Sequence, residues 1–353
     1  MLLVLSQYSP EDTALEQRIA KGRAELFIQP ASTAAVHPLP PAIRRRADAI
    51  VHVASTTFID GTPGDYPRCQ IVVRSGVGYD KVDLAGWGSV GVACCNVPDY
   101  GTSEVADHAL ALMLALTRGT ATYHDALRTD PAGNWDHAKA PLVRRLRGST
   151  FGVVGLGRIG LAAALRARAF GMEIAFYDPY LAPGMEITVG ARRVTSLVAL
   201  MATSDVVSIH VPSNHETHGL IAVRELAAAK PGLVLINTAR GTIVDLDALY
   251  NAMKSGRIAA AGLDVLPKEP ADSEHPLIKA WVAREAWLEG RLTLSPHAAF
   301  YSPDALTDLR TKGIKTALLA LETGRVINCV NAGLINEAKQ KARQLKMHPG
   351  GTS

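Results

Sequence analysis

Three glycines stand directly behind a short apolar run and directly before an alanine-rich segment. They are Gly155, Gly157 and Gly160 in FGVVGLGRIG, and the segment LAAALRARAF follows them. The apolar run predicts a strand, and the alanine-rich segment predicts a helix. A lone G-x-G-x-x-G is weak evidence, because any tight turn from a strand to a helix can use glycine. The surrounding elements therefore decide what the motif indicates.

A second predicted strand follows this helix and ends at Asp178, eighteen residues beyond Gly160. In a dinucleotide-binding βαβ unit the glycines permit the turn, admit the pyrophosphate and allow close helix packing, and the helix N-terminus faces the phosphate charge. An acidic residue at the end of the second strand accepts hydrogen bonds from the ribose and repels a 2′-phosphate. The pattern thus predicts a dinucleotide site, in which Asp178 favours NAD over NADP. A structural glycine turn beside a surface aspartate is the alternative.

Short strand-like runs alternate with helical segments along most of the chain, which is the pattern of repeated β-α units on a parallel sheet. The first series contains LLVLS, ELFIQ, AIVHVAS, IVVRSG and GVACCNV. The second series contains TFGVVGL, EIAFYDP, DVVSIHVP, LVLINTA, AAAGLDV and RLTLSPH. We predict an α/β fold with two Rossmann-like domains, each built on a parallel sheet.

The connections between the two series indicate how the domains divide the chain. A long helical segment leads into the second domain, and the last helical segment with its polar tail is expected to return to the first. The outer, substrate-binding domain is therefore discontinuous, with residues 1–101 and 299–353, and the NAD-binding domain holds residues 102–298. The stretch TDPAGNWDHAKAPLVRRLRG predicts an extended surface arm, in which Trp135 is either a core residue or a dimer contact.

The composition is that of a globular protein with two domains. Of the 353 residues, 48% are hydrophobic and 20% are charged, and the net charge is +4. Lys and Arg are scattered apart from two short clusters, so nucleic acid is not an expected partner. The N-terminal apolar run is too short for a signal peptide, and no apolar segment is long enough to span a bilayer. We therefore expect a cytoplasmic protein with no membrane partner.

Four cysteines and two neighbouring histidines also need an interpretation. The cysteines form no C-x-x-C pair, so we expect buried thiols in a reducing compartment and no disulfides; they are Cys69, Cys94, Cys95 and Cys329. His215 and His218 resemble a pair of metal ligands, but no third ligand is placed near them, so no metal is expected.

Three side chains suited to catalysis follow predicted strands of the second series. Arg240 lies in NTARG, Glu269 in GLDVLPKEP and His297 in SPHAAFYS. The carboxyl ends of parallel strands share one edge, where ligands bind in open α/β sheets, so we expect these side chains to face one cleft. Arg240 can grip a 2-oxo carboxylate, His297 can move the proton that accompanies a hydride, and Glu269 can hold the imidazole ring. Taken singly, each has an ordinary alternative: a surface arginine, a solvated glutamate and an interface histidine.

These motifs together resemble the D-isomer-specific 2-hydroxyacid dehydrogenase family over nearly the whole chain. Within that family the sequence is most similar to the branch that contains the C-terminal-binding-protein corepressors. The resemblance is carried by CNVPDYGTSEVADHAL, FYDPYL, NTARGTIVD, GLDVLPKEP and PHAAFYS. It implies NAD (NADH) as the cofactor and a homodimer formed through the NAD-binding domain.

The resemblance also implies roles for individual residues. Arg240 orients the 2-oxo acid, His297 is the acid/base and Glu269 is its partner. The segment that starts at Arg74 matches the loop whose backbone amides receive the substrate carboxylate. The predicted substrate-binding residues are Arg74, Val77, Gly78 and Phe300. The predicted cofactor-binding residues are Gly155, Gly157, Arg158, Ile159, Gly160, Asp178, Thr102, Thr238 and Asp264, the last at the position that binds the nicotinamide carboxamide.

Two departures from the corepressor branch affect the expected function. Phe300 stands where those proteins carry a tryptophan, and the stretch between Glu269 and His297 is longer than theirs. The expected function is the NAD-dependent interconversion of a 2-oxo acid and a D-2-hydroxy acid. The alternatives are an NAD(H)-sensing, corepressor-like interaction protein, and another reaction of the family such as the oxidation of formate or phosphite.

Overall fold

The chain forms two compact units that are each built around one parallel sheet. The computed structural model describes residues 1–8, 12–31, 38–53, 59–335 and 346–347. The first unit holds residues 1–101 and 302–353, and the second holds residues 102–301. The sequence-based boundary for the return to the first unit lies at residue 299, and the contacts within the units place it at residue 302.

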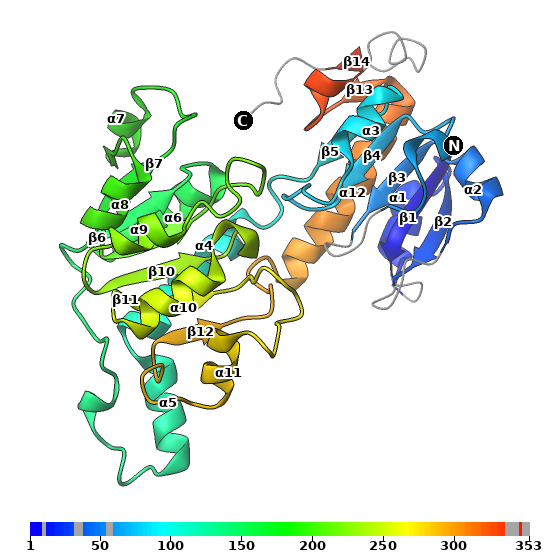
Figure 1. Ribbon diagram of the computed structural model, residues 1–353. Coiled ribbons are helices and arrows are strands. Elements are labelled where there is room, and N and C mark those ends of the chain that lie inside the picture. The colour runs from blue at the N-terminus through cyan, green and yellow to red at the C-terminus, as the bar shows by residue number, and fades with distance from the viewer. Residues whose placement is uncertain (9–11, 32–37, 54–58, 336–345, 348–353) are drawn as a thin grey trace. The chain divides into compact units, whose positions relative to one another are not determined.

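Five parallel strands form the sheet of the first unit, in the order β2-β1-β3-β4-β5 (Figure 1). They are β1 (Leu2–Tyr8), β2 (Glu25–Pro30), β3 (Ala49–His52), β4 (Ile71–Arg74) and β5 (Ala93–Asn96). The helices of this unit are α1 (Ala14–Ala20), α2 (Pro41–Arg46), α3 (Leu84–Ser89) and α12 (Pro303–Thr323), with 3-10 turns η1 (Pro63–Asp65) and η4 (Ala332–Leu334). A short separate pair joins β13 (Arg325–Val326) to β14 (Lys346–Met347). The five strands confirm the first predicted series.

Helix α12 covers one face of this sheet and contacts β3 and β4. Its start is capped by the Ser302 hydroxyl, and its end is set by Gly324, whose φ of +70° suits glycine. A side chain at Gly313 would collide with the Ser75 side chain, so glycine lets the helix approach the end of β4 closely. The opposite face is filled by a second cluster in which the Tyr66 and Trp87 rings lie 5.5 Å apart between centroids.

Seven parallel strands form the sheet of the second unit, in the order β12-β11-β10-β9-β6-β7-β8 (Figure 1). They are β6 (Thr150–Val154), β7 (Glu173–Tyr177), β8 (Arg192–Arg193), β9 (Val206–Ile209), β10 (Leu233–Asn237), β11 (Ile258–Leu263) and β12 (Leu292–Leu294). Six of them confirm the second predicted series. The sequence missed β8, because a two-residue edge strand of two arginines has no apolar pattern.

Helices cover both faces of the seven-stranded sheet. They are α4 (Thr102–Thr117), α5 (Thr120–Thr129), α6 (Arg158–Ala169), α7 (Met185–Val189), α8 (Leu197–Thr203), α9 (Val223–Ala227), α10 (Leu246–Lys254) and α11 (Pro276–Val282), with 3-10 turns η2 (His137–Lys139) and η3 (Gly241–Ile243). Apolar residues of α4 and α6 fill one cluster, and those of α8, α9, α10 and α11 fill the other. This burial on both sides explains why the strands read as continuous apolar runs.

The predicted arm is largely irregular between α5 and β6, with η2 as its one helical turn. The Tyr123 hydroxyl donates a hydrogen bond to the carbonyl of His137, at 2.7 Å, and so ties the arm to α5. The side chain of Trp135 is 81% exposed. Within this chain, therefore, Trp135 is not a core residue.

The four cysteines are free thiols. Cys69, Cys94 and Cys95 are buried as predicted, whereas Cys329 is only half-buried, because its segment lies at the edge of the five-stranded sheet beside β5. Within the described ranges, none of the helices combines the length and the apolar character that a membrane span requires.

Candidate active site

The glycine turn connects β6 to α6. Gly155 has a φ of +86°, which a residue with a side chain rarely adopts, and its N–H donates to the carbonyl of Tyr177 at 2.9 Å. A Cβ at Gly160 would collide with the carbonyl oxygen of Gly155, so the third glycine allows α6 to pack against the turn. A Cβ at Gly157 would meet nothing within 4 Å. The first and third glycines thus build the turn, and the second leaves its backbone open to a ligand.

Asp178 lies at the end of β7, directly beside this turn. Its carboxylate accepts hydrogen bonds from the N–H of Leu156 at 3.0 Å, of Tyr180 at 3.0 Å and of Leu181 at 3.2 Å. Asp178 is half-buried, and these bonds hold its carboxylate against the start of the glycine turn. The residue therefore has a structural role in addition to any contact with a ribose.

The turn after β10 presents Thr238 and Arg240. The Asn237 side chain holds this turn, because its amide donates to the carbonyl of Arg240 at 2.9 Å and its oxygen accepts from the N–H of Ala239 at 3.0 Å. Among the described residues, nothing hydrogen-bonds to the buried hydroxyl of Thr238. A buried polar atom of this kind indicates a bound group or water.

A tight contact brings the Arg240 turn against the loop that carries Glu269. A Cβ at Gly241 would collide with the backbone of Leu266 and Pro267, so only glycine permits this approach. Burial opposes the ionisation of Glu269, but hydrogen bonds from His297 and Leu266 and the positive charge of Arg240 hold its pKa below the ordinary value. Glu269 is therefore an ionised carboxylate at neutral pH.

His297 follows β12 and forms an ion-pair contact with Glu269. Its Nδ1 lies 2.7 Å from Glu269 Oε2, and Oε1 of the same carboxylate accepts from the Leu266 N–H at 3.1 Å. His297 has a φ of +53°, which is a strained backbone conformation for a residue other than glycine. Residues with such strain cluster at functional sites. Its N–H donates to the carbonyl of Asp264 at 2.8 Å, and its ring meets that of Phe300 edge-on, 6.2 Å between centroids. With Nδ1 turned to the carboxylate, Nε2 is the ring nitrogen that can face a substrate.

Asp264 is buried at the end of β11, and both of its oxygens are engaged by the turn after β12. Oδ1 accepts from the Ser295 hydroxyl at 2.6 Å and the Ala298 N–H at 2.9 Å, and Oδ2 accepts from the Ala299 N–H at 3.0 Å. The Ser295 hydroxyl also lies 2.8 Å from Nε2 of His108, on α4. Asp264 thus fixes the backbone on either side of His297.

The predicted substrate loop lies in the first unit, at the end of β4. Arg74 is buried, and its guanidinium donates to the carbonyl of Ser75. The Asn96 side chain donates to the carbonyl of Val77 at 2.8 Å, and the N–H of Val97 donates to the carbonyl of Gly76 at 3.1 Å. The loop is therefore held by the end of β5.

The structure thus brings Arg240, Glu269, His297 and Phe300 together at the carboxyl edge of the seven-stranded sheet. The glycine turn lies at the same edge, since the strands are parallel. Thr102 is the first residue of α4, and Arg158 and Ile159 open α6. The sequence did not indicate four supporting side chains: Asn96, His108, Asn237 and Ser295. Asn96, His108 and Ser295 bond to residues that are distant in the chain, so no local signal indicates their roles. Asn237 bonds within its own turn, but asparagine is too common after a strand to indicate a role.

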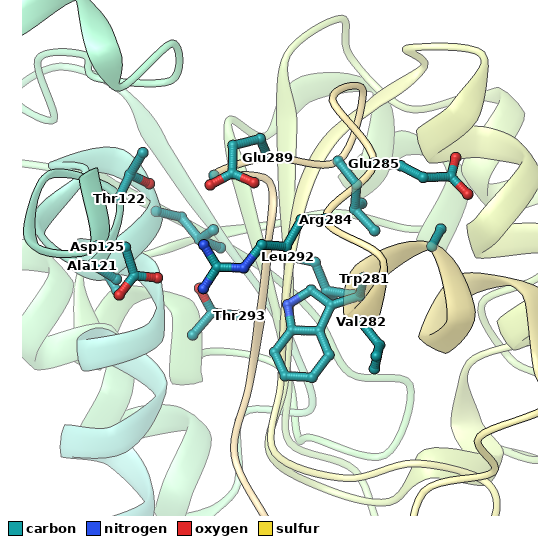
Figure 2. Close-up of a pocket in the computed structure, with 15 residues that line it drawn as sticks. Ala121, Thr122, Asp125, Trp281, Val282, Arg284, Glu285, Glu289, Leu292 and Thr293 are labelled. Carbon is teal, nitrogen blue, oxygen red and sulfur yellow. The ribbon is translucent and has the colours of Figure 1, made fainter. Parts of the chain in front are cut away.

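A separate pocket of about 340 Å³ lies between α5, α11 and the start of β12 (Figure 2). Figure 2 shows the Arg284 side chain extending across it toward Asp125, with Trp281 and Val282 on the side of α11. None of the predicted site residues lines it. Leu292 and Thr293 of β12 belong to this pocket, whereas His297 lies beyond the other end of the strand. In the part of the chain that the structure describes, no three His, Cys, Asp or Glu side chains are grouped as metal ligands.

Residues 110–299 match the model of the D-isomer specific 2-hydroxyacid dehydrogenase, NAD binding domain. The chain belongs to this family. The matched region contains the glycine turn, Arg240, Glu269 and His297, so the region that carries these residues is an NAD-binding domain of the family.

Known proteins of this family resemble the chain over most of its length. D-3-phosphoglycerate dehydrogenase of Mycobacterium leprae is 36% identical over 293 residues, which cover 82% of this chain and 53% of that protein. The chain thus spans about half the length of that relative. A glyoxylate reductase from Paecilomyes thermophila has a TM-score of 0.79 at 27% identity, and the match covers 94% of this chain and 98% of that one. D-Lactate dehydrogenase from Aquifex aeolicus, solved with NAD and lactic acid, has a TM-score of 0.75 at 27% identity, and the match covers 91% and 96%.

Proposed function

We propose that the protein is an NAD-dependent oxidoreductase that interconverts a 2-oxo acid and a D-2-hydroxy acid. The single observation that carries the proposal is the Glu269–His297 pair, 2.7 Å apart, at the sheet edge that also holds Arg240 and the glycine turn. A paired carboxylate and imidazole suit proton transfer, and family membership supplies the hydride chemistry that this proton accompanies.

The glycine turn and its neighbours would hold the cofactor. Gly157 leaves the backbone open to a pyrophosphate, and the N-terminus of α6 favours its negative charge. Among the described residues nothing hydrogen-bonds to the Thr238 hydroxyl, so this hydroxyl can form a hydrogen bond with a ligand. The residues present therefore fit a dinucleotide. We expect the charge of Asp178 to favour NAD over NADP, and we expect contacts from Thr102, Arg158 and Ile159. Asp264 would act on the nicotinamide mainly by fixing the turns around it, because the bonds described above engage both of its oxygens.

The reaction would use three side chains of the second unit. Arg240 grips the carboxylate and polarises the 2-oxo group of the substrate with its planar fork of donors. His297 donates a proton from Nε2 to the carbonyl oxygen during reduction and takes it back during oxidation. Glu269 stabilises the imidazolium and fixes the ring orientation through Nδ1. The cofactor held at the glycine turn would supply the hydride that this proton accompanies.

The substrate would be a small 2-oxo acid whose carboxylate meets the loop of Arg74, Val77 and Gly78. Phe300 packs edge-on against His297, so its ring is placed to limit the substrate side chain. We further propose a homodimer formed through the NAD-binding domain, to which the exposed Trp135 suits a contact. The corepressor-like branch, and with it an NAD(H)-sensing role, remains a prediction from the motifs. The oxidation of formate or phosphite remains one as well.

The test is a spectrophotometric screen of NADH oxidation over glyoxylate, pyruvate, hydroxypyruvate, phenylpyruvate and branched 2-oxo acids. Turnover of at least one of them, abolished in Arg240→Ala, is the expected result. NADH binding without turnover of any of these acids would favour the sensing role instead. Oxidation of formate or phosphite by NAD, with no 2-oxo acid reduced, would assign the chain to that other chemistry.

A further inference from the structure

Two cysteines face each other at the edge of the five-stranded sheet. Cys95 on β5 and Cys329, which follows β13, form an antiparallel bridge. The N–H of Asn96 donates to the carbonyl of Asn328 at 3.2 Å, and the N–H of Val330 donates to the carbonyl of Cys94 at 2.8 Å. These bonds flank the two cysteines on both sides, which makes Cys95 and Cys329 a non-hydrogen-bonded pair of an antiparallel ladder.

This position brings two side chains within reach of a covalent bond. In a non-hydrogen-bonded pair the Cα atoms lie about 4.5 Å apart and the side chains approach each other closely. Disulfides join Cα atoms that are about 4.4–6.8 Å apart. The two sulfurs already interact, because the Cys95 thiol donates a hydrogen bond to the Cys329 sulfur. The backbone geometry of such a pair is therefore compatible with a bond between the two sulfurs.

The segment around Cys329 is held firmly in this register. The side chain of Asn331 accepts from the N–H of Cys94 at 2.8 Å and donates to the carbonyls of Val92 at 3.1 Å and Leu84 at 3.3 Å. These three bonds join the residues that follow Cys329 to residues that precede Cys95, and so hold one side of the bridge in place. The fold itself therefore holds the two sulfurs close together, because hydrogen bonds fix the Cys329 segment against β5.

The two thiols also differ in the way that disulfide formation requires. Cys329 is half-buried and therefore accessible, whereas Cys95 is buried. The hydrogen bond from Cys95 lowers the pKa of Cys329, which favours its nucleophilic thiolate. By contrast, the hydrogen bond to Cys329 and burial raise the pKa of Cys95 well above its ordinary value. Cys329 is thus the thiol that an oxidant meets first, and Cys95 is the thiol beside it.

We propose that Cys95 and Cys329 are a peroxide-oxidised thiol pair that closes a reversible disulfide between β5 and the segment after β13. The Cys329 thiolate attacks one oxygen of a hydroperoxide, the O–O bond breaks, and Cys329 becomes a sulfenic acid while an alcohol, or water from hydrogen peroxide, leaves. The Cys95 thiol then attacks that sulfur and its proton passes to the leaving hydroxyl, so that an S–S bond forms and the S–O bond breaks with release of water. The hydroperoxide is reduced by two electrons, and the two thiols together lose two hydrogens.

The disulfide has a structural consequence that does not depend on the proposed catalytic activity. It closes a loop that runs from residue 95 to residue 329 and contains the whole second unit. Such a long covalent loop restricts the unfolded chain and stabilises the folded one. Oxidation is therefore expected to raise the melting temperature of the first unit. It also fixes the end of β5, where Asn96 holds the carbonyl of Val77.

The experiment uses the full-length protein treated with hydrogen peroxide, quenched with catalase and titrated for thiols in denaturant. The untreated chain has four thiols, and we expect two after oxidation, with all four restored by a dithiol reductant. Non-reducing peptide mapping is expected to show a Cys95–Cys329 cross-link and a mass lower by two hydrogens. Because Cys94 adjoins Cys95, the map is repeated in Cys94→Ala, which leaves one candidate partner on β5.

Variants separate the pair from the other thiols. Cys329→Ser alters a half-buried position and is expected to retain all of its remaining thiols after the same treatment and to lose the rise in melting temperature. Cys69→Ser is the matched control, because it removes a cysteine outside the pair and is expected still to lose two thiols. A cross-link that uses Cys94, an unchanged thiol count, or oxidation of Cys329 only to a sulfinic acid would overturn the proposal. Each of these readouts is independent of whether 2-oxo acids are reduced.

Discussion

Each unit contains a parallel sheet, but the residues at the end of the first strand differ between the two units. In the second unit β6 runs into Gly155, and Gly157 leaves open space where a side chain would stand. In the first unit β1 ends at Tyr8, a buried aromatic side chain in the core. Glu16 is buried close to it and pairs with Arg310, at 2.6 Å between Oε1 and Nε. Among the described residues, therefore, side chains pack around the end of β1, whereas the turn after β6 presents open backbone at Gly157.

This contrast shows which part of dinucleotide binding depends on the strand order and which part depends on the turn after the first strand. Both strand orders create a crevice where neighbouring crossovers diverge, and the order in the first unit is the flavodoxin-like one. The turn after β6 combines a glycine at positive φ, an open position at Gly157 and a following helix of twelve residues. We therefore expect cofactor binding and proton transfer in the second unit, and substrate positioning by the loop after β4 in the first.

The largest expected effect is that of His297→Ala. If His297 is the acid/base, its removal lowers kcat/KM for 2-oxo acid reduction by about 10²- to 10⁴-fold, the usual contribution of a positioned proton donor. The glycine turn is untouched, so the Kd for NADH is expected to stay within about twofold of wild type. Steady-state kinetics and NADH fluorescence titration measure the two quantities. Retained turnover would remove His297 from this role.

Arg240→Ala is expected to lower kcat/KM by about 10²- to 10³-fold, because it removes a donor that acts on the developing charge of the 2-oxo group. NADH binding is expected to persist here as well. Arg240→Lys serves as the control that keeps the charge, and it is expected to recover only part of the loss, since an ammonium lacks the planar fork. Full recovery by lysine would show that charge alone suffices.

Gly157→Ala and Gly160→Ala distinguish a ligand-binding glycine from a structural one. At Gly157 a Cβ meets nothing in the protein but would meet a bound pyrophosphate, and overpacking costs about 1–3 kcal/mol, so the Kd for NADH is expected to rise by about 5- to 150-fold with an unchanged melting temperature. At Gly160 a Cβ collides with the Gly155 carbonyl, so the melting temperature is expected to fall. Equal NADH affinity of Gly157→Ala and wild type would exclude a pyrophosphate at this turn.

Glu269→Gln tests the pairing of this carboxylate with the imidazole of His297. Glutamine keeps the hydrogen-bonding shape but removes the negative charge that lies beside Nδ1, so kcat/KM for 2-oxo acid reduction is expected to fall by about tenfold. The Kd for NADH is expected to stay unchanged, since the glycine turn is untouched. Equal kcat/KM in the two proteins would show that the charge of Glu269 does not assist proton transfer.

Asn96→Ala has the smallest expected effect and tests the contribution of the first unit. It leaves the carbonyl of Val77 without the donor at 2.8 Å, which costs about 1 kcal/mol and corresponds to about a fivefold rise in KM for the 2-oxo acid. The Kd for NADH is expected to be unchanged, because the glycine turn lies in the other unit. A parallel loss of NADH affinity would contradict the division between the units.

The difference between what could and could not be predicted follows the range of the interactions. The β6–α6 turn is encoded locally, since strand, glycines, helix and Asp178 lie within a short stretch. The same holds for eleven strands with apolar runs, but not for β8, whose two arginines have none. The hydrogen bonds of Asn96 and His108 join distant segments, so the sequence near these residues does not predict them. The three hydrogen bonds of Asp178 to backbone N–H groups could not be predicted either, because an acidic residue after a strand gives the same pattern whether it binds a ribose or caps a turn.

The most direct test of the account is the transfer of deuterium from NADH that carries deuterium at both C4 positions to the 2-oxo acid that the protein reduces fastest. The product is analysed by chiral chromatography and mass spectrometry. The account predicts a D-2-hydroxy acid with one deuterium at C2, formed by wild type and lost in His297→Ala. An L-2-hydroxy acid, or a product without deuterium at C2, would contradict it.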